Sequence, residues 1–154
     1  MSVVYFMIGV QGSGKSTWAR ANARRLRAKI LSSDAVRNEL EAQGIDATNE
    51  SDRVFAILEE RLGAMLKRGR NVIVDATHAR RRWRERELVV ARTYGAKVIA
   101  VWLDVPLPLA LERNQHKPGG KLWGERVVPE EVLRGVSRKF ELPEVGEFDE
   151  VWKM

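Results

Sequence analysis

The sequence predicts an α/β protein in which a parallel β-sheet carries helices on both faces. Short apolar runs alternate with longer helical patterns along the 154 residues, and such alternation implies right-handed crossovers between parallel strands. A second observation is a glycine-rich segment, Gly9–Thr17, between the first apolar run and the first helical pattern. Ligands of such sheets bind beyond the carboxyl ends of the strands. Functional side chains are therefore expected at that edge.

The expected elements follow one another in a regular order. Strands are expected at residues 3–8, 29–31, 72–74 and 98–103, with a weak fifth strand at 147–152. Helices are expected at residues 15–27, 34–42, 50–67, 80–94, 107–115 and 130–140. The first run is continuously apolar, as in a strand buried on both faces. In the third helix Val54, Leu58, Leu62 and Met65 share one face, which predicts core packing.

Glycine and proline support several of these boundaries. Gly69 and Gly95 follow the third and fourth helices as C-caps would. Pro129 fits the first turn of the last helix. A segment rich in glycine, residues 116–124, separates the last two helices and predicts a mobile loop. We take residues 114–128 as a lid over a site at the carboxyl edge.

Composition restricts the class of protein. A chain of 154 residues suits one domain with one core, here residues 1–154. It has no cysteine, no apolar run near the ~20 residues of a membrane span, and no signal-peptide layout. These features predict a cytoplasmic protein without membrane association. The net charge of +6 and a pI near 10.0 favour an anionic partner such as nucleic acid. The same charge is explained equally well by arginines on ordinary solvent-exposed helix faces.

The glycine-rich segment is a complete phosphate-binding loop, GxxxxGK[ST]. Its backbone N–H groups and the following helix N-terminus can surround a triphosphate. Lys15 can reach the β- and γ-phosphates, and the Ser16 hydroxyl can hold Mg²⁺. The residues predicted to bind ATP are Gly9, Gly12, Ser13, Gly14, Lys15, Ser16 and Thr17. A flexible Gly/Ser turn is the plainer alternative.

Asp34 and Arg37 follow the second expected strand and therefore lie beside the phosphate loop. A kinase needs a carboxylate to accept the proton of the attacking hydroxyl, and a cation can hold a charged acceptor. The two residues are three positions apart and share a helix face. Alternatively, Asp34 caps the helix and Arg37 is a surface residue. Next to the phosphate loop we favour the catalytic interpretation.

Asp75 ends the third expected strand, where a carboxylate can contribute to the Mg²⁺ shell. The alternative is a carboxylate that only ends the strand. Thr77 and His78 follow, and we expect them to contact the acceptor. For His78 a position as a polar residue at the sheet edge is the alternative, and both are favoured over a role as metal ligand or base.

Further cations surround the expected lid. Arg113, Lys117, Lys121 and Arg126 can neutralise charge that develops during phosphoryl transfer. Ordinary basic loop residues are the plainer alternative. Arg82, in a basic run that opens the fourth helix, could grip an acceptor phosphate. A solvated helix face is the simpler interpretation of that run.

These motifs together resemble a known family. In order, the chain carries Gly12-Ser-Gly-Lys-Ser-Thr17, Ser33-Asp-Ala-Val-Arg37, Val74-Asp-Ala-Thr77, Glu112-Arg-Asn114 and Val128-Pro-Glu-Glu-Val132. The set is similar to the 5′-kinase domain of phage-type polynucleotide kinase, a small P-loop kinase with an AAA-type ATP-binding domain. The resemblance implies a three-layer P-loop NTPase fold with strand order 2-3-1-4-5 and a mobile lid. It also implies transfer of the ATP γ-phosphate to a 5′-hydroxyl end of DNA or RNA.

The resemblance assigns roles to particular residues. Asp34 matches the general base, Arg37 the clamp on the acceptor phosphate, and Asp75 a supporting carboxylate. Arg113 and Arg126 match lid arginines and are the further catalytic candidates, with Lys117 or Lys121 as alternatives for the role of Arg126. His78 stands where an asparagine is common, and the lid is longer than the phage pattern. The phosphatase domain of bifunctional relatives has no counterpart in these residues. Relatives include dimers and tetramers, and no apolar stripe here demands either. A kinase of a small metabolite or nucleoside, and an ATP-binding module without turnover, remain as alternatives.

Overall fold

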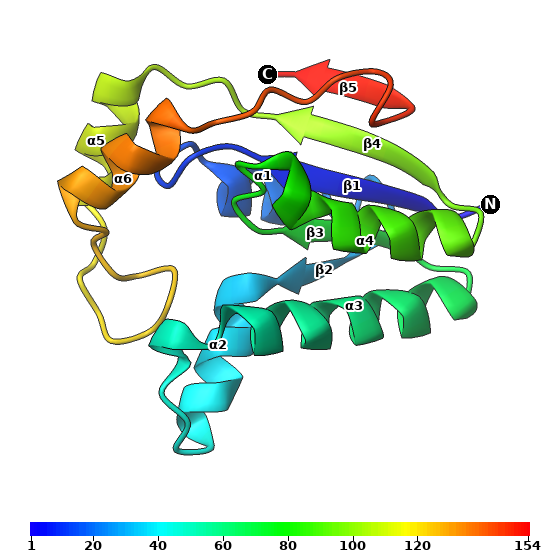
Figure 1. Ribbon diagram of the computed structural model, residues 1–154, viewed down its shortest axis with the longest axis horizontal. Coiled ribbons are helices and arrows are strands. Elements are labelled where there is room, and N and C mark those ends of the chain that lie inside the picture. Colours follow the sequence, from blue (N-terminus) through cyan, green and yellow to red (C-terminus); the bar gives the residue numbers. More distant parts are fainter.

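A five-stranded parallel sheet in the order β2-β3-β1-β4-β5 forms the centre of the computed structural model, which describes residues 1–154 (Figure 1). The strands are β1 (Val3–Ile8), β2 (Ala28–Ser32), β3 (Asn71–Asp75), β4 (Lys97–Trp102) and β5 (Glu150–Lys153). The helices are α1 (Lys15–Asn22), α2 (Ser33–Ala42), α3 (Ser51–Lys67), α4 (Arg81–Thr93), α5 (Leu107–Gln115) and α6 (Glu130–Arg138), with a 3₁₀ turn η1 (Ala47–Asn49) before α3. The predicted fold class and strand order are confirmed.

The register of the sheet brings the predicted site residues to one edge. Asp75 pairs with Met7 of β1 and with Ser32 of β2. The chain leaves β1 into the phosphate loop and leaves β2 directly into α2. The phosphate loop, the start of α2 and the end of β3 therefore meet at the carboxyl edge.

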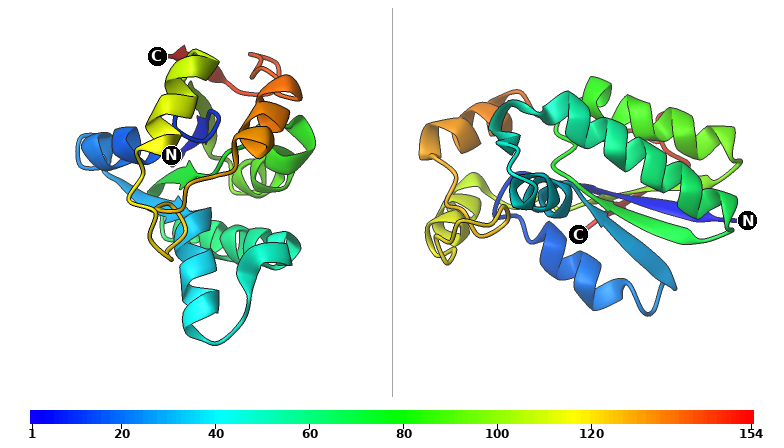
Figure 2. Two further views of the ribbon diagram at one scale, coloured as in Figure 1. Left: turned by 90° about the vertical axis from the view of Figure 1, so that its left-hand side faces the viewer. Right: turned by 90° about the horizontal axis from the view of Figure 1, so that it is seen from below.

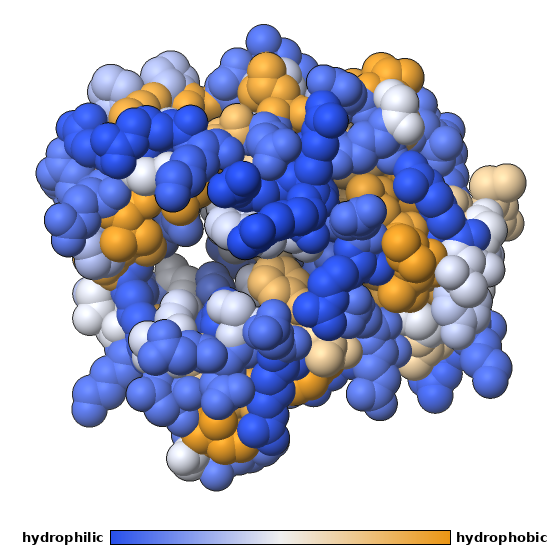
Figure 3. All heavy atoms as spheres, viewed as in Figure 1, coloured by the Kyte–Doolittle hydropathy of each residue, from blue (hydrophilic) through white to orange (hydrophobic).

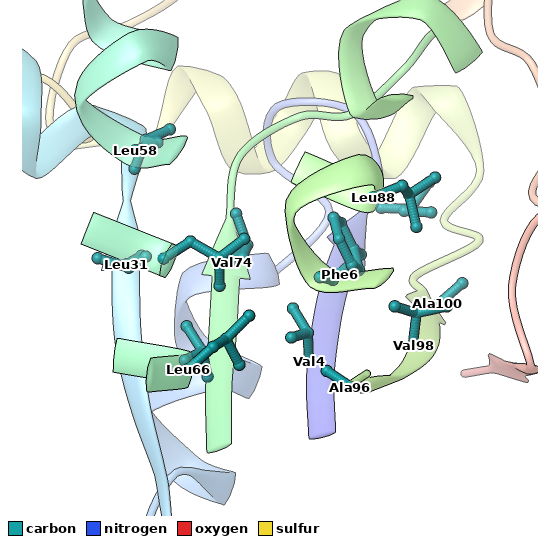
Figure 4. Packing of buried hydrophobic residues seen from close by; sticks show 14 of the residues in the cluster. Val4, Phe6, Leu31, Leu58, Leu66, Val74, Leu88, Ala96, Val98 and Ala100 are labelled. Atoms are coloured by element: carbon teal, nitrogen blue, oxygen red, sulfur yellow. The ribbon is translucent and has the colours of Figure 1, made fainter. Parts of the chain in front are cut away.

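Helices cover both faces of the sheet, as the alternating pattern predicted. On one face α1 packs against Tyr5, Met7 and Ile73. On the other, α3 and α4 cover a larger core that contains Val4, Phe6 and Val74. Figure 2 shows α1 on one side of the sheet and α3 and α4 on the other. Figure 4 shows Leu58 and Leu66 of α3 and Leu88 of α4 over the strands. At about 25 cal/mol per Å² of buried apolar surface, this core is the main source of stability.

Several boundaries differ from the prediction. The first helix ends at Asn22 rather than Arg27, because a turn reverses the chain there with Arg27 at φ 51°. The last strand begins at Glu150 rather than Glu147, because residues 145–147 form a turn and Phe148 is buried in the core. The C-cap positions of Gly69 and Gly95 are confirmed by φ values of 72° and 68°.

Beyond the carboxyl edge of the sheet, α5 and α6 pack around a small third apolar cluster that contains Val10, Ala110 and Leu133. The segment between these helices, the predicted lid, runs back toward α2 (Figure 1). None of the helices combines the length and apolar character needed to cross a membrane.

Candidate active site

The phosphate loop is shaped by glycines at positions that exclude a side chain. Gly12 and Gly14 have φ values of 82° and 95°, which L-residues rarely adopt. A Cβ on Gly12 would clash with the carbonyl of Ala110 in α5. The loop closes through the Ser13 N–H, which donates to the Val10 carbonyl at 3.1 Å. Within it, the Lys15 ammonium donates to that same carbonyl at 3.1 Å.

Lys15 is half-buried at the floor of the site. Burial lowers the pKa of Lys15 and Lys117 acts in the same direction, while the charges of Asp75 and Asp34 oppose that shift. The hydrogen-bond partner of the ammonium is the Val10 carbonyl, which phosphate oxygens would replace.

Ser16 and Asp75 provide the oxygens expected for Mg²⁺. The Ser16 hydroxyl donates to Asp75 Oδ2 at 2.7 Å, and Asp75 is only 7% exposed. No group of three or more His, Cys, Asp or Glu side chains forms a complete protein cage for a metal. A serine hydroxyl and one carboxylate fit Mg²⁺ in a nucleotide site, where phosphates and water supply the remaining ligands.

Asp34 is available for chemistry because another residue caps its helix. The Ser32 hydroxyl accepts from the Ala35 N–H at 3.2 Å, so Ser32 and not Asp34 is the N-cap of α2. Asp34 instead lines the cleft above the phosphate loop. Burial, and next to it the charge of Asp75, raises the pKa of the Asp34 carboxyl; Lys15 and Lys117 pull it down. Such a carboxylate has an increased affinity for a proton.

The lid is fastened to α2 through Trp123. Its N–H donates to Asn38 Oδ1 at 2.7 Å, and the Asn38 amide donates back to the Trp123 carbonyl at 3.2 Å. The Trp123 indole N–H donates to Glu41 at 2.9 Å. Behind it Gly124, at φ 93°, lies so close to Asp34 that a Cβ would be 3.4 Å from Oδ2.

Two predicted catalytic arginines contact the lid tryptophan. The guanidinium of Arg126 lies 4.4 Å from the Trp123 ring centroid and pairs with Glu41 at 2.8 Å. That of Arg37 lies 4.8 Å from the same centroid and donates to the Ala47 carbonyl and the Ser51 hydroxyl. Arg126 lines the cleft, whereas Arg37 does not. The position of Arg37 outside the cleft lining does not support its expected contact with the acceptor, and two of its guanidinium nitrogens are engaged by Ala47 and Ser51.

Arg113 of α5 and Thr77 both line the cleft. Arg113 donates to the Ser13 carbonyl at 3.4 Å, beside the phosphate loop. Thr77 lines the cleft, and its carbonyl accepts from the Gly9 N–H at 3.3 Å. Both side chains can therefore face a ligand in the cleft.

The structure contradicts the expected acceptor contact of His78. Its side chain is buried beside Phe6, its Nδ1–H donates to the Met7 carbonyl at 2.8 Å, and Nε2 lies 3.7 Å from Glu87. A φ of 50° turns this residue away from the cleft and into the core. The expectation for Arg82 is not supported either, since Arg82 is exposed on α4 and does not line the cleft. The simpler interpretation of a solvated helix face fits its position.

These parts enclose a cleft of about 1230 Å³ between the phosphate loop, α2 and the lid. Figure 3 shows the surface hollowed between the region of α5 and α6 and the region of α2. Sequence reasoning missed Asn38 and Glu41, although they follow Asp34 at i+4 and i+7 and so form a polar stripe on one helix face. It also missed Gly124, whose role depends on a contact 90 positions away in the chain.

The chain is similar to known proteins over most of its length. Residues 4–143 match a family model described as AAA domain. A shikimate kinase from Gloeobacter violaceus is 28% identical over 76% of this chain and 64% of its own length. The human heterogeneous nuclear ribonucleoprotein U-like protein 2 is 26% identical over 96% of this chain. The chain spans only 64% and 21% of the lengths of these two relatives.

Solved structures share the fold. A gluconokinase from Sinorhizobium meliloti superposes with a TM-score of 0.67 at 22% identity, covering 97% of this chain and 81% of that one. A chain of the Pnkp1/Rnl/Hen1 complex superposes with a TM-score of 0.64 at 26% identity, covering 73% of this chain and 38% of that one. The likeness to the gluconokinase supports the P-loop kinase fold alone.

Proposed function

Because the chain belongs to the AAA domain family and has the fold of the P-loop kinases, we propose that it transfers the γ-phosphate of ATP to the 5′-hydroxyl end of a nucleic acid. The observation that carries this proposal is the position of Asp34. Its carboxylate does not cap α2, because Ser32 does so, and it lines the same cleft as Lys15. A hydroxyl placed beside Asp34 would face a triphosphate held by the phosphate loop.

In the proposed reaction the acceptor oxygen attacks the γ-phosphorus in line with the leaving β-γ bridging oxygen. Asp34 accepts the hydroxyl proton as the new O–P bond forms, and ADP leaves. Lys15 and Arg113 stabilise the negative charge on the transferred group and the leaving oxygen. Mg²⁺, held by Ser16 and water near Asp75, would neutralise the β- and γ-phosphates. The lid excludes water, which would otherwise compete as acceptor.

Three features support a nucleic-acid acceptor. The chain carries a net charge of +6, which favours a polyanion. Asp34 and Arg37 stand three positions apart on α2, the spacing of the polynucleotide 5′-kinases that the chain resembles, although only Asp34 lines the cleft in this arrangement. The similarity to a chain of the Pnkp1/Rnl/Hen1 RNA repair complex also supports a nucleic-acid acceptor.

The test is direct phosphorylation. Protein, Mg²⁺ and γ-labelled ATP are incubated with a 5′-hydroxyl oligonucleotide and, separately, with the same oligonucleotide already 5′-phosphorylated. Label on the first alone is expected, and Asp34→Asn should slow the labelling by roughly 10²- to 10⁴-fold while ATP binding, measured by calorimetry, persists. Labelling of both oligonucleotides, or labelling by Asp34→Asn at the rate of the wild type, would contradict the proposal.

A small hydroxyl-bearing metabolite is the second candidate acceptor. The lid backbone at Gly124 lies directly over Asp34, and the Arg37 guanidinium packs against the Trp123 ring. The closed cleft therefore suits a compact acceptor. The shikimate kinase relative is consistent with this. If no oligonucleotide is labelled although ATP binds, the same assay applied to sugar acids and cyclic polyols distinguishes this candidate from a module without turnover.

A further inference from the structure

Six exposed cations gather at the amino-terminal edge of the sheet, opposite the cleft. They lie in the turn that joins α1 to β2 and at the end of α3 with its turn into β3. We call them the basic patch: Arg24, Arg25, Arg27, Lys67, Arg68 and Arg70. Figure 2 shows both turns at the end of the molecule that is remote from α5 and α6.

The sheet itself brings the two turns together. Ala28 pairs with Asn71 where β2 and β3 begin, so Arg27 and Arg70 precede neighbouring, hydrogen-bonded positions. The Asn71 side chain also donates to the Leu26 carbonyl at 3.1 Å. The patch therefore rests on a fixed part of the fold and not on two independent loops.

The charges of the basic patch are not neutralised within the molecule. None of its six residues takes part in a salt bridge, whereas Arg61, Arg86 and Arg134 elsewhere on the surface are paired with glutamates. Neither residues 1–33 nor residues 61–74, the segments that supply the patch, contain any Asp or Glu. Six cations without local counter-charge create a positive field that attracts anions.

Arg27 occupies a backbone position that favours glycine. Its φ of 51° is in the left-handed region, where a side chain strains the backbone. A contact of the Arg27 side chain with a binding partner would explain why arginine, and not glycine, stands at this position.

The shape and chemistry of the surroundings favour a linear polyanion. Arg20 of α1 lines the cleft, and Arg24 lies two residues beyond the end of α1, so cations lead from the cleft along α1 to the patch. None of the exposed large hydrophobic side chains lies within either turn, whereas a membrane-binding surface would combine cations with apolar anchors. We propose that the basic patch binds the phosphate backbone of a nucleic acid strand, as a contact surface separate from the cleft. This goes beyond the proposed function because it concerns binding and requires no transfer of phosphate.

The test measures binding without the reaction. A 5′-phosphorylated, fluorescein-labelled single strand of 20 nucleotides is titrated with protein in the absence of ATP, at several salt concentrations, by fluorescence anisotropy. The variant Arg24→Gln/Arg27→Gln/Arg70→Gln should bind at least about 10-fold more weakly. Its plot of log affinity against log salt should be shallower by about 2, since each lost phosphate contact on a single strand contributes about 0.7.

A matched control separates the patch from net charge. Arg53→Gln/Arg138→Gln/Lys139→Gln removes the same three charges from exposed, unpaired positions elsewhere, and less than a threefold loss of affinity is expected. An equal loss in both variants, or no loss in the patch variant, would overturn the proposal. So would binding of the wild type to phosphatidylserine vesicles or polyglutamate but not to the oligonucleotide.

Arg27→Gly provides a test that misfolding cannot imitate. Glycine suits φ 51°, so the melting temperature should be unchanged or higher while the affinity for the oligonucleotide falls. Affinity equal to that of the wild type in this variant and in the triple variant would refute the patch. Binding through the patch with no phosphorylation of 5′-hydroxyl ends would refute the proposed function and leave this proposal standing.

Discussion

Asn38 and Trp123 hold each other through two hydrogen bonds across 85 positions of the chain. The Trp123 N–H donates to Asn38 Oδ1 at 2.7 Å, and the Asn38 amide donates to the Trp123 carbonyl at 3.2 Å. Asn38 lies one helical turn after Asp34 on α2. The helix that carries the proposed base thus also fixes the lid, so closing the lid and positioning Asp34 are coupled.

We expect Asn38→Ala to release the lid without damaging the core. Two hydrogen bonds at about 1 kcal/mol each correspond to roughly a 10- to 30-fold loss of kcat/KM. Hydrogen exchange of residues 116–128 should accelerate. Gln43→Ala, at the exposed end of the same helix, is the control and should change neither. Unaltered exchange in the lid of Asn38→Ala would show that the two hydrogen bonds do not hold it.

The environment of Asp34 predicts the pH dependence of activity. Burial and the nearby Asp75 raise the pKa of this carboxyl, and Asp34 must be ionised to accept a proton. The kcat/KM should therefore fall as the pH drops through that raised pKa, at a higher pH than for an exposed aspartate. Asp34→Asn should lower kcat by roughly 10²- to 10⁴-fold and remove this acidic limb from the residual rate.

The same shift predicts that Asp34→Asn stabilises the folded protein. A carboxyl with a raised pKa binds protons more tightly in the folded than in the unfolded state, so its favourable contribution is lost as the pH rises. At pH 7 the ionised Asp34 therefore destabilises the folded state, and asparagine removes this destabilisation. The melting temperature of Asp34→Asn should exceed that of the wild type at pH 7, with the difference shrinking toward pH 4. A melting temperature of Asp34→Asn below that of the wild type at pH 7 would contradict the conclusion that the ionised Asp34 carboxylate destabilises the folded state.

Gly124 allows a test of how closely the lid must approach Asp34. A Cβ there would lie 3.4 Å from Asp34 Oδ2, while Gly44 has a similar positive φ with nothing within 4 Å. Both Gly124→Ala and Gly44→Ala should destabilise by about 1–2 kcal/mol through backbone strain. Only Gly124→Ala should also lower kcat by 10-fold or more, since only there does the methyl group crowd the base. Equal kcat values in Gly124→Ala and Gly44→Ala would show that phosphoryl transfer does not require the close approach of the lid to Asp34.

Local patterns in the sequence were sufficient for the strands and for the residues that depend on them. Lys15 and Asp75 were found because each stands at a fixed place relative to an apolar run, and the parallel sheet brings such places to one edge. His78 was misplaced because the adjacent Asp75 and Thr77 do face the cleft. Its φ of 50° and its hydrogen bond to Met7 depend on tertiary packing that no local pattern encodes. The fastening of Trp123 to Asn38 and Glu41 was missed for the same reason.

Arg84 is expected to contribute more to stability than any other charged residue of α4. It is fully buried, pairs with Glu147 at 2.9 Å and donates to the carbonyls of His78 and Glu141 at 2.9 and 3.0 Å. Its guanidinium thereby ties the segment after β3 to the chain that follows α6. Arg84→Met would retain the apolar volume but leave the Glu147 carboxylate and two carbonyls without their partner.

Removing one partner of a buried ion pair typically costs about 3–5 kcal/mol, because the other charge remains buried and uncompensated. Urea denaturation of Arg84→Met should therefore show a loss of this size, while Arg82→Met on the exposed face should stay within about 0.5 kcal/mol. Adding Glu147→Gln to Arg84→Met should recover part of the loss, since it removes the unpaired carboxylate. If the double variant is no more stable than the sum of the two single changes predicts, the role of Arg84 lies in its hydrogen bonds to the two carbonyls and not in the ion pair.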